Sequence, residues 1–257
     1  MSATEAFRSV AAGPKVQFIL LHEVKDDEKD RFSRLLDWLQ SQYQVVSYSD
    51  AVLALTNEQT KDSLACISFD DGLKNNLNAA RIMTERGMSG CFFISPAIIG
   101  ERSQQVIDDY CKDRMLFKNS LPFMDWDDLE WMIENGHEIG NHSNHHYYMM
   151  DLGDQQFDQE VSEANETLTN RLGEIKHFAW PYGRFFHFRR ERVDRVIQLG
   201  HASCASGERG CHQISTETPY CIRRDSISIS WPLRHIKTFL KRASRNPIAP
   251  DQTWSRN

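Results

Sequence analysis

Short apolar runs alternate with amphipathic segments along most of this 257-residue chain, and this alternation constrains the fold more than any other feature. A run of four to eight apolar residues predicts a buried strand, whereas apolar residues spaced three and four apart predict a helix. Regular strand–helix alternation is typical of a parallel sheet with helices packed outside it. We therefore expect an α/β fold.

The expected elements follow one another in a regular order. We expect strands over residues 16–22, 63–72, 89–95, 137–143, 176–183 and 201–206, and helices over residues 29–42, 75–87, 124–136, 154–173, 190–200 and 232–242. Asp125 is the expected N-cap of its helix, and Gly87 and Gly136 are the expected helix stops. The chain shows no internal repeat and no long Gly/Ser/Pro linker. We expect one domain over residues 15–242, between flexible segments over 1–14 and 243–257.

Composition and charge argue against several kinds of partner. The formal net charge is −6, whereas proteins that bind nucleic acid carry basic patches, so we expect no nucleic-acid partner. No run approaches the roughly 18 continuous apolar residues of a membrane span. The N-terminal residues lack the apolar region of a signal peptide, and the six cysteines lack CxxC spacing. We expect a cytoplasmic protein with reduced thiols; the sequence indicates no particular oligomeric state.

Three of the ten histidines lie within residues 142–146, in the segment HSNHH. His142 and His146 are four residues apart, so they can face the same side and bind one metal ion. The HExxH zinc motif has this spacing, but its glutamate is absent here. From these residues alone, a polar surface loop explains the cluster equally well.

A second chemical feature is the segment SFDDG at 68–72, which ends an expected buried strand with two adjacent carboxylates. Such carboxylates repel each other and lose hydration, so they need a cation or a proton. One of them together with two histidines would form the ligand set of a catalytic zinc site. The alternative is an Asp-Gly turn in which one acid caps the next helix. Because sites in α/β barrels are built where strands end, both features are expected in one site.

SFDDG, HSNHH and FAWPYG, in this order, resemble the motifs TFDDG, H[ST]xxH and RxPYG of the NodB-homology polysaccharide deacetylases, carbohydrate esterase family 4. The resemblance covers roughly residues 15–225. It implies a distorted (β/α) barrel with about seven parallel strands. It also implies a metal-dependent deacetylase that hydrolyses the acetamide of an N-acetylated sugar, in a glycan or glycan precursor, to a free amine and acetate.

The resemblance also assigns roles to residues of the three motifs. Asp71, His142 and His146 are the expected ligands of one divalent metal ion, with zinc as the default and cobalt, nickel or iron compatible with the same ligands. Asp70 is the expected general base, which takes a proton from a water molecule activated by the metal. The backbone N–H of Tyr182 is expected to donate to the oxyanion.

The leaving amine requires a proton, which most of the family supplies from a histidine in a C-terminal LxH motif. Here Leu20-Leu21-His22 ends the first expected strand, an arrangement that resembles the circularly permuted poly-N-acetylglucosamine deacetylases. We therefore expect His22 to be the general acid and Leu20 to contact the acetyl methyl group. The competing interpretation of His22 is a strand-end histidine satisfied by hydrogen bonds.

The third motif departs from the family pattern. Ala179 stands where the family has an arginine that pairs with the catalytic aspartate, and Arg223 or Arg224 is a candidate replacement. We expect Arg223, with Trp180 and Pro181, among the substrate-binding residues. Trp180 either stacks on a sugar ring or packs in the core, since strand residues alternate faces.

Two other functions fit these features. One is hydrolysis of another small amide, since allantoinase-like and cyclic-imidase relatives share this barrel, and fold alone does not separate the two. The other is a glycan-binding relative with little or no turnover, which the missing arginine suggests.

Overall fold

The computed structural model describes residues 13–254 of the chain. Its strands are β1 (Lys15–Leu21), β2 (Gln44–Val45), β3 (Leu64–Phe69), β4 (Cys91–Ile94), β5 (Glu138–Asn141), β6 (His177–Ala179), β7 (Ser203–Ala205), β8 (His212–Gln213) and β9 (Asp225–Ser226). Its α-helices are α1 (Lys29–Gln42), α2 (Tyr48–Ala54), α3 (Asn76–Thr84), α4 (Gln104–Asp113), α5 (Trp126–Glu134), α6 (Asp154–Leu172), α7 (Arg192–Gln198) and α8 (Leu233–Arg245). Every expected strand and helix is present, and α2, α4 and the two-residue strands are additional.

The strands form a curled, mostly parallel sheet. The order β7–β6–β5–β4–β3–β1 joins six strands in parallel, and β8 pairs antiparallel with the start of β1. Ile222 forms a parallel bridge with Ala205 of β7, and β9, three residues later, pairs in parallel with β1. Residues 222–226 therefore act as a seventh parallel strand that closes the barrel between β7 and β1. The expected distorted (β/α) barrel with about seven parallel strands is confirmed.

Alternation along the strands divides the core into an inner and an outer part. In β1, Phe18 faces the barrel interior, where it packs with Tyr48 of α2, while Ile19 and Leu21 face the surrounding helices. In β3, Cys66 belongs to the interior and Ile67 to the outer cluster. Side chains two positions apart on a strand share a face. The residues two and four positions after Phe18 and Cys66 therefore lie on the interior side, at the mouth of the barrel.

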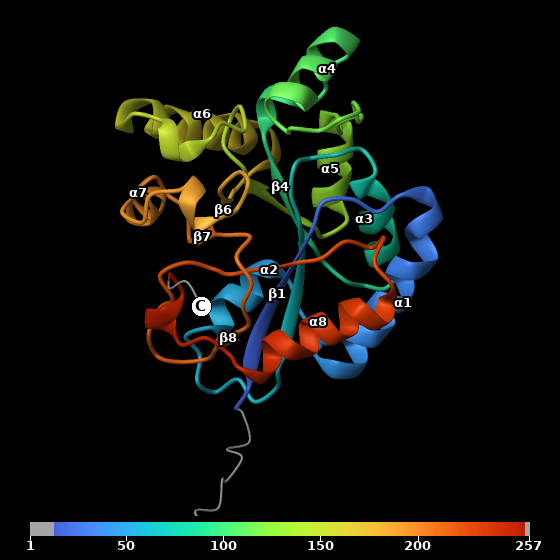
Figure 1. Cartoon of the computed structure of the whole chain (residues 1–257), viewed down its shortest axis with the longest axis vertical. Helices are drawn as coiled ribbons and strands as arrows, with labels where there is room; N and C mark the ends of the chain where they lie inside the picture. The colour runs from blue at the N-terminus through green and yellow to red at the C-terminus, as the bar shows by residue number, and fades with distance from the viewer. Residues whose placement is uncertain (1–12, 255–257) are drawn as a thin grey trace, which may run out of the picture.

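Helices cover the outside of the curled sheet (Figure 1). In that view α1, α3, α5 and α8 lie on the right, α6 and α7 lie on the left, and α4 projects at the top. Asp125 caps α5 as expected, since its side chain accepts a hydrogen bond from the N–H of Asp128. Gly136 follows α5 with φ +81°, a conformation that glycine adopts without the strain of a side chain.

The chain beyond residue 242 corrects one expectation. Residues 243–254 are packed, so the expected flexible tail is wrong for this stretch. Ile248 bridges to His212, Thr253 is buried, and its hydroxyl accepts a hydrogen bond from the N–H of Cys221. The apolar side chains of Ile248 and Trp254 anchor the segment, and Trp254 packs against Trp180 at 5.5 Å between ring centroids. Of the other residues expected to be flexible, 13 and 14 precede β1 without regular secondary structure, and 1–12 and 255–257 lie outside the described part of the chain.

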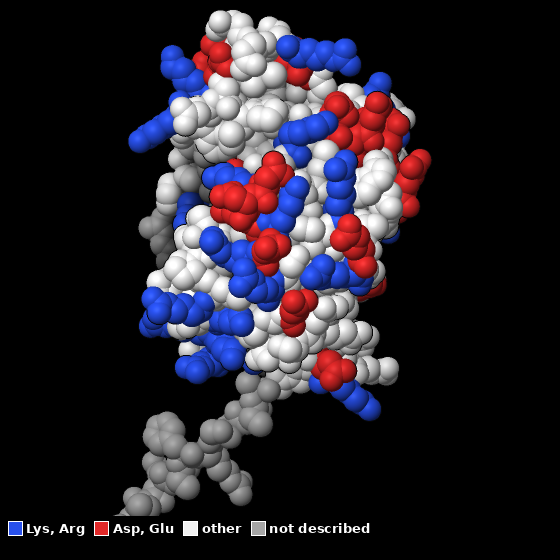
Figure 2. All heavy atoms as spheres, turned by 90° about the vertical axis from the view of Figure 1, so that its right-hand side faces the viewer, with Lys and Arg blue, Asp and Glu red and all other residues white. Residues whose placement is uncertain are grey.

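The distribution of surface charge and the composition of the helices bear on the expected partners. On the face shown in Figure 2, acidic and basic side chains are interspersed. Among residues 13–254, no helix is both long enough and apolar enough to cross a membrane.

Candidate active site

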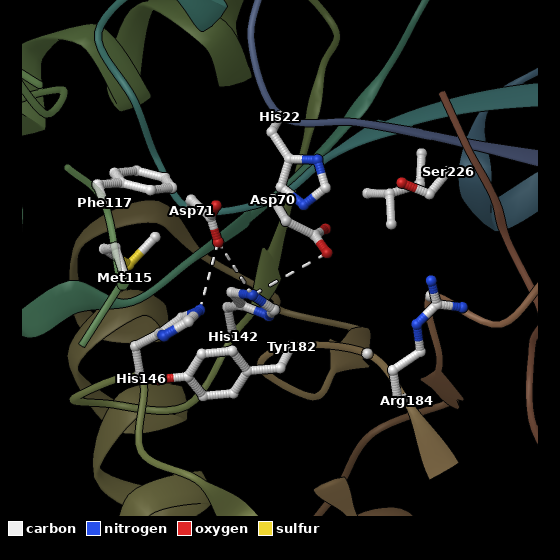
Figure 3. A pocket seen from close by; sticks show the side chains of 13 residues that line it. His22, Asp70, Asp71, Met115, Phe117, His142, His146, Tyr182, Arg184 and Ser226 are labelled. Carbon is white, nitrogen blue, oxygen red and sulfur yellow. Dashed lines mark ion pairs between the residues drawn. The ribbon is translucent and has the colours of Figure 1, made fainter. Parts of the chain in front are cut away.

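A cavity of about 280 Å³ lies at the carboxyl ends of the strands, and the chemical features of the sequence meet there. β1 contributes Leu20 and, just after its end, His22; β3 is followed by Asp70 and Asp71. The remaining lining residues include His142, His146, Tyr182, Arg184, Ser226, Met115 and Phe117 (Figure 3). Residues separated by up to 206 positions in the chain thus form one site, because the parallel strands bring their carboxyl ends to one side.

Asp71, His142 and His146 form a group of three buried side chains that could hold a metal ion. The Asp71 Oδ1 atom lies 3.5 Å from the Nε2 atom of His142 and 3.3 Å from that of His146. All three ligand atoms lie within 4.8 Å of one another. This spacing and chemistry fit a divalent ion bound by two imidazoles and one carboxylate, with room for water or substrate.

Outer hydrogen bonds fix the orientation of both imidazole rings. The Nδ1–H of His142 donates to the carbonyl oxygen of Ala179 at 2.7 Å, and the Nδ1–H of His146 donates to that of Arg114 at 3.0 Å. A carbonyl oxygen only accepts, so Nδ1 carries the proton on each ring and Nε2 is left with its lone pair directed at Asp71. Such partners are typical of metal-binding histidines.

The electrostatics of the three side chains favour a positive charge between them. Burial disfavours ionisation of Asp71, but the hydrogen bonds that His142 and His146 donate when Nε2 is also protonated outweigh burial and hold the pKa of Asp71 well below its usual value. Burial opposes charging of His142, yet the nearby carboxylates of Asp70 and Asp71 raise the pKa of His142. The site therefore stabilises a cation, whether a proton or a metal ion.

Several backbone positions around the site adopt the left-handed region that residues other than glycine rarely occupy. The φ angles are +79° at Asp71, +54° at His146 and +62° at Tyr182. Conformations of this kind raise the free energy of the folded chain by about 1–3 kcal/mol each and concentrate at functional sites. Here they redirect the chain at the ends of β3, β5 and β6, so that the ligands reach one cavity.

Asp70 is held by a buried arginine that comes from another part of the chain. The guanidinium of Arg224 donates to Asp70 through Nη1 at 2.7 Å and through Nη2 at 2.8 Å. Arg224 is 0% exposed, and it also donates to the carbonyl oxygen of Ser206 and to the hydroxyl of Ser68. Ala179 faces the same interior as Phe93, over which Arg224 lies at 4.9 Å. Arg224, from residues 222–226, thus pairs with Asp70, which the alanine at position 179 cannot do.

The expectation that Arg223 binds substrate is wrong. Its guanidinium points away from the cavity and donates to the carbonyl oxygens of Thr253 and Arg209. Neighbouring residues on an extended segment point to opposite faces, so only one of Arg223 and Arg224 can enter the barrel interior. Arg223 instead helps to hold the packed C-terminal segment.

The expectation that Trp180 stacks on a sugar is also wrong. Trp180 is 0% exposed and stacks on Phe188 at 4.5 Å between ring centroids. Phe178 and Trp180 share the outer face next to α6 and α7, whereas Ala179 between them points inward. Pro181 is buried and does not line the cavity, so it shapes the turn that presents Tyr182.

Leu20, His22 and Tyr182 do lie in the cavity as expected. Leu20 is buried, whereas His22 is exposed at the mouth, across the cavity from Tyr182 in Figure 3. The Tyr182 hydroxyl donates to the carbonyl oxygen of Arg114 at 2.5 Å. The phenol hydroxyl of Tyr182 is therefore already hydrogen-bonded within the protein.

His145, the remaining histidine of the cluster, has a structural contact with α6. Its Nδ1 lies 2.7 Å from the Oε1 atom of buried Glu160, and its backbone N–H donates to the Oε2 atom of the same side chain. This pair anchors the loop that carries His142 and His146. The cluster therefore divides into two candidate metal ligands, His142 and His146, and one residue, His145, that anchors the loop.

Met115, Phe117, Arg184 and Ser226 line the cavity although the motifs do not single them out. Met115 and Phe117 belong to the long connection between β4 and α5, which also supplies the Arg114 carbonyl. In the sequence, only the position of this connection, directly after the carboxyl end of a strand, indicates that it could contribute to the site, because site residues concentrate there. Its residue types alone do not indicate which side chains face inward.

Comparisons with known proteins agree with this architecture. A family model described as polysaccharide deacetylase matches residues 57–202, more than half of the chain, and the three motifs lie within the match. No curated protein matches the chain.

Solved structures share the fold at low sequence identity. IcaB from Ammonifex degensii is 16% identical with a TM-score of 0.64, covering 90% of this chain and 98% of its own. The deacetylase PplD from Streptococcus pyogenes, solved with acetate, is 13% identical with a TM-score of 0.68, covering 89% of this chain and 99% of its own. A polysaccharide deacetylase from Bacillus cereus is 13% identical with a TM-score of 0.69, covering 89% and 69% respectively. Together with the family match, the fold and the site show that this chain belongs to the polysaccharide deacetylase family.

Proposed function

We propose that the protein is a metal-dependent deacetylase that hydrolyses the acetamide of an N-acetylated sugar to a free amine and acetate. One observation carries the proposal. Three buried metal-binding side chains lie next to Asp70, a carboxylate locked by Arg224, in a single cavity. The Oδ2 atom of Asp70 lies 4.0 Å from the Nε2 atom of His142, so a water molecule between them could contact both.

Asp71, His142 and His146 would hold the metal ion, with zinc as the default among the ions that accept these ligands. A divalent ion there would supply Lewis-acid activation of water and of the acetyl carbonyl group. The chain itself supplies a rigid donor set, because the carbonyl oxygens of Ala179 and Arg114 hold both imidazoles in place.

The remaining residues provide the proton transfers and the positioning. Asp70 accepts a proton from the attacking water molecule, whose oxygen forms a bond with the acetyl carbon. Both Asp70 oxygens already accept from Arg224, but each keeps a second lone pair. As the C–N bond breaks, His22 donates a proton to the amine nitrogen. The Tyr182 N–H donates to the oxyanion, and Leu20 contacts the methyl group.

The arrangement also bears on the two alternative functions. A glycan-binding protein without turnover was suggested by the missing arginine, and Arg224 removes that reason. Hydrolysis of another small amide uses the same cavity chemistry and is distinguished by substrate. We keep the sugar because the cavity is open at His22 and Arg184, which suits a substituent larger than a small ureide.

Metal content and acetate release test the proposal. We expect about one equivalent of metal, measured by plasma mass spectrometry, in wild type and none in Asp71→Ala/His142→Ala after identical dialysis. His235→Ala, which removes an exposed histidine on α8, is the control and should keep its metal. With metal bound, Asp70→Asn should lower acetate release from N-acetylated sugars by ~10²–10⁴-fold, the usual contribution of a general base. Unchanged turnover in Asp70→Asn would refute its role, and a wild type that binds no metal would refute the metal site.

A further inference from the structure

The carboxyl end of helix α4 supports the candidate metal site from outside the cavity. Arg114 is the C-cap residue of α4, and a carbonyl group at the end of a helix has no partner within that helix. Its oxygen accepts from the Nδ1–H of His146 at 3.0 Å and from the hydroxyl of Tyr182 at 2.5 Å. The rings of His146 and Tyr182 lie 4.9 Å apart between centroids (Figure 3). A carbonyl oxygen has two lone pairs, so one backbone atom orients both side chains and is fully used by them.

Packing of α4 itself does little to hold this carbonyl group in place. The helix projects at the top of Figure 1, and Cys111 is the one buried side chain among its ten residues. Leu116, two residues after Arg114, has φ +56° and is 66% exposed. A left-handed conformation raises the free energy of such a residue, and an exposed side chain gains little packing in return. The position of the Arg114 carbonyl group therefore depends on contacts made by its neighbours and by the Arg114 side chain.

The Arg114 side chain makes such a contact with the loop that carries the candidate ligands. Its guanidinium lies over the ring of Tyr147, 4.2 Å from the ring centroid, an arrangement in which the cation is attracted to the aromatic face. Tyr147 directly follows His146, is half-buried and packs against the apolar cluster that includes Trp180. The ring of Tyr147 thus ties the end of α4 to the core of the barrel.

We propose that the contact between Arg114 and Tyr147 positions His146 and Tyr182 for the reaction. The proposal rests on the proposed function, in which His146 binds the metal ion and the Tyr182 N–H donates to the oxyanion. Neither Arg114 nor Tyr147 lines the catalytic cavity, so both act through the Arg114 carbonyl oxygen. Without the contact the end of α4 shifts, and the two rings lose their shared acceptor.

Zinc affinity tests this positioning role. The Kd for Zn²⁺ is measured by competition with a chromogenic chelator, at a temperature where each metal-free variant is folded. Tyr147→Leu removes the aromatic face and keeps an apolar side chain, and we expect Kd to rise by about 10–100-fold, the usual effect of losing an outer partner of a metal ligand. Tyr147→Phe keeps the aromatic face and should bind zinc as wild type does. An unchanged Kd in Tyr147→Leu would overturn the proposal.

A second pair of the same kind provides the matched control. The guanidinium of Arg190 lies 4.7 Å from the ring centroid of Tyr220, and neither residue lines the catalytic cavity. Tyr220→Leu should therefore keep the wild-type Kd, and a rise equal to that of Tyr147→Leu would overturn the specific role of Tyr147. Arg114→Met removes the cation and keeps the backbone carbonyl group. It should raise Kd as Tyr147→Leu does, and the double variant should add little to either, since both changes remove one contact.

Turnover and the protonation of the imidazole ring complete the test. At saturating zinc, Tyr147→Leu should lower kcat with little change in KM, because the Tyr182 N–H acts on the oxyanion and not on the bound substrate. If wild type binds no zinc, the proposed function fails, and NMR of the imidazole nitrogens decides the positioning role alone. In the neutral ring of His146 the proton should lie on Nδ1 in wild type and Tyr147→Phe, and on both nitrogens in exchange in Tyr147→Leu. The same tautomer in all three proteins would overturn the proposal.

Discussion

The pair formed by Arg224 and Asp70 allows a sharp test, because both side chains are buried and each depends on the other. Replacing Arg224 with methionine keeps most of the side-chain volume and removes the charge. Asp70, 4% exposed, would then keep its charge in the interior without a partner. Removing one member of a buried ion pair is strongly destabilising for this reason.

The structure sets the expected size of the effect. Two charge-assisted hydrogen bonds, at 2.7 and 2.8 Å, are lost together. At about 1.5–3 kcal/mol each they sum to about 3–6 kcal/mol, which agrees with the roughly 3–5 kcal/mol measured for broken buried pairs. We expect Arg224→Met to lower the free energy of unfolding by about 4 kcal/mol. At ~2–4 °C per kcal/mol for a domain of this size, Tm should fall by about 8–16 °C.

Denaturant titration of a double-mutant cycle measures the pair directly. Asp70→Asn alone leaves Arg224 buried without its counter-charge, whereas Arg224→Met/Asp70→Asn removes both charges. The double variant should therefore be more stable than the sum of the single changes predicts, by about 2–3 kcal/mol. Additive changes, within about 0.5 kcal/mol, would show that the two side chains do not interact as the structure indicates.

Three further predictions concern the core, the pH dependence and the metal. Trp180→Ala should lower the free energy of unfolding by about 3–5 kcal/mol while leaving KM unchanged at a temperature where the variant is folded; a raised KM with unchanged stability would restore the sugar-stacking role. Burial lowers the pKa of His201 to about 4. The unfolded state takes up this proton near pH 6.5, so the stability contribution of neutral His201 is present above pH 6.5 and is lost as the pH falls toward 4, by about 3 kcal/mol. His201→Phe should flatten the wild-type loss of stability over that range, and an identical pH slope in both proteins would contradict the assignment. Removing the metal with a chelator should lower Tm in wild type, by the equivalent of about 4 kcal/mol at a free metal concentration 1,000 times Kd. Asp71→Ala/His142→Ala should show no such shift, and an equal shift in both proteins would place the ion elsewhere.

Much of the fold could be predicted from local patterns. The apolar runs that became β1, β3 and β4 were predicted as strands because buried parallel strands are apolar on both faces. The two additional helices, α2 and α4, were not predicted from the sequence, for different reasons. α2 spans only seven residues, too few for a helical period to stand out, and α4 buries only Cys111 although its apolar residues share one face.

The three candidate metal ligands, Asp71, His142 and His146, could also be picked out from the sequence, because motif spacing and strand-end position coincide at these residues, and the structure brings them together. The errors at Trp180 and Arg223 share one cause, the face of the strand on which a side chain lies. Trp180 and Arg223 were assigned to the cavity, and both point away from it. A shift of one residue along a strand moves a side chain to the opposite face, and short strands provide too few residues to fix that phase.

The sequence by itself determined the fold class, the order of the strands and helices, and which residue types could bind a metal ion, because these follow from periodicity and from chemistry within short segments. Only the tertiary structure decided that Arg224 holds Asp70 and that His145 anchors the loop to Glu160. These contacts join residues as far apart as 154 positions. Their geometry depends on how the barrel closes through residues 222–226, which no local pattern specifies.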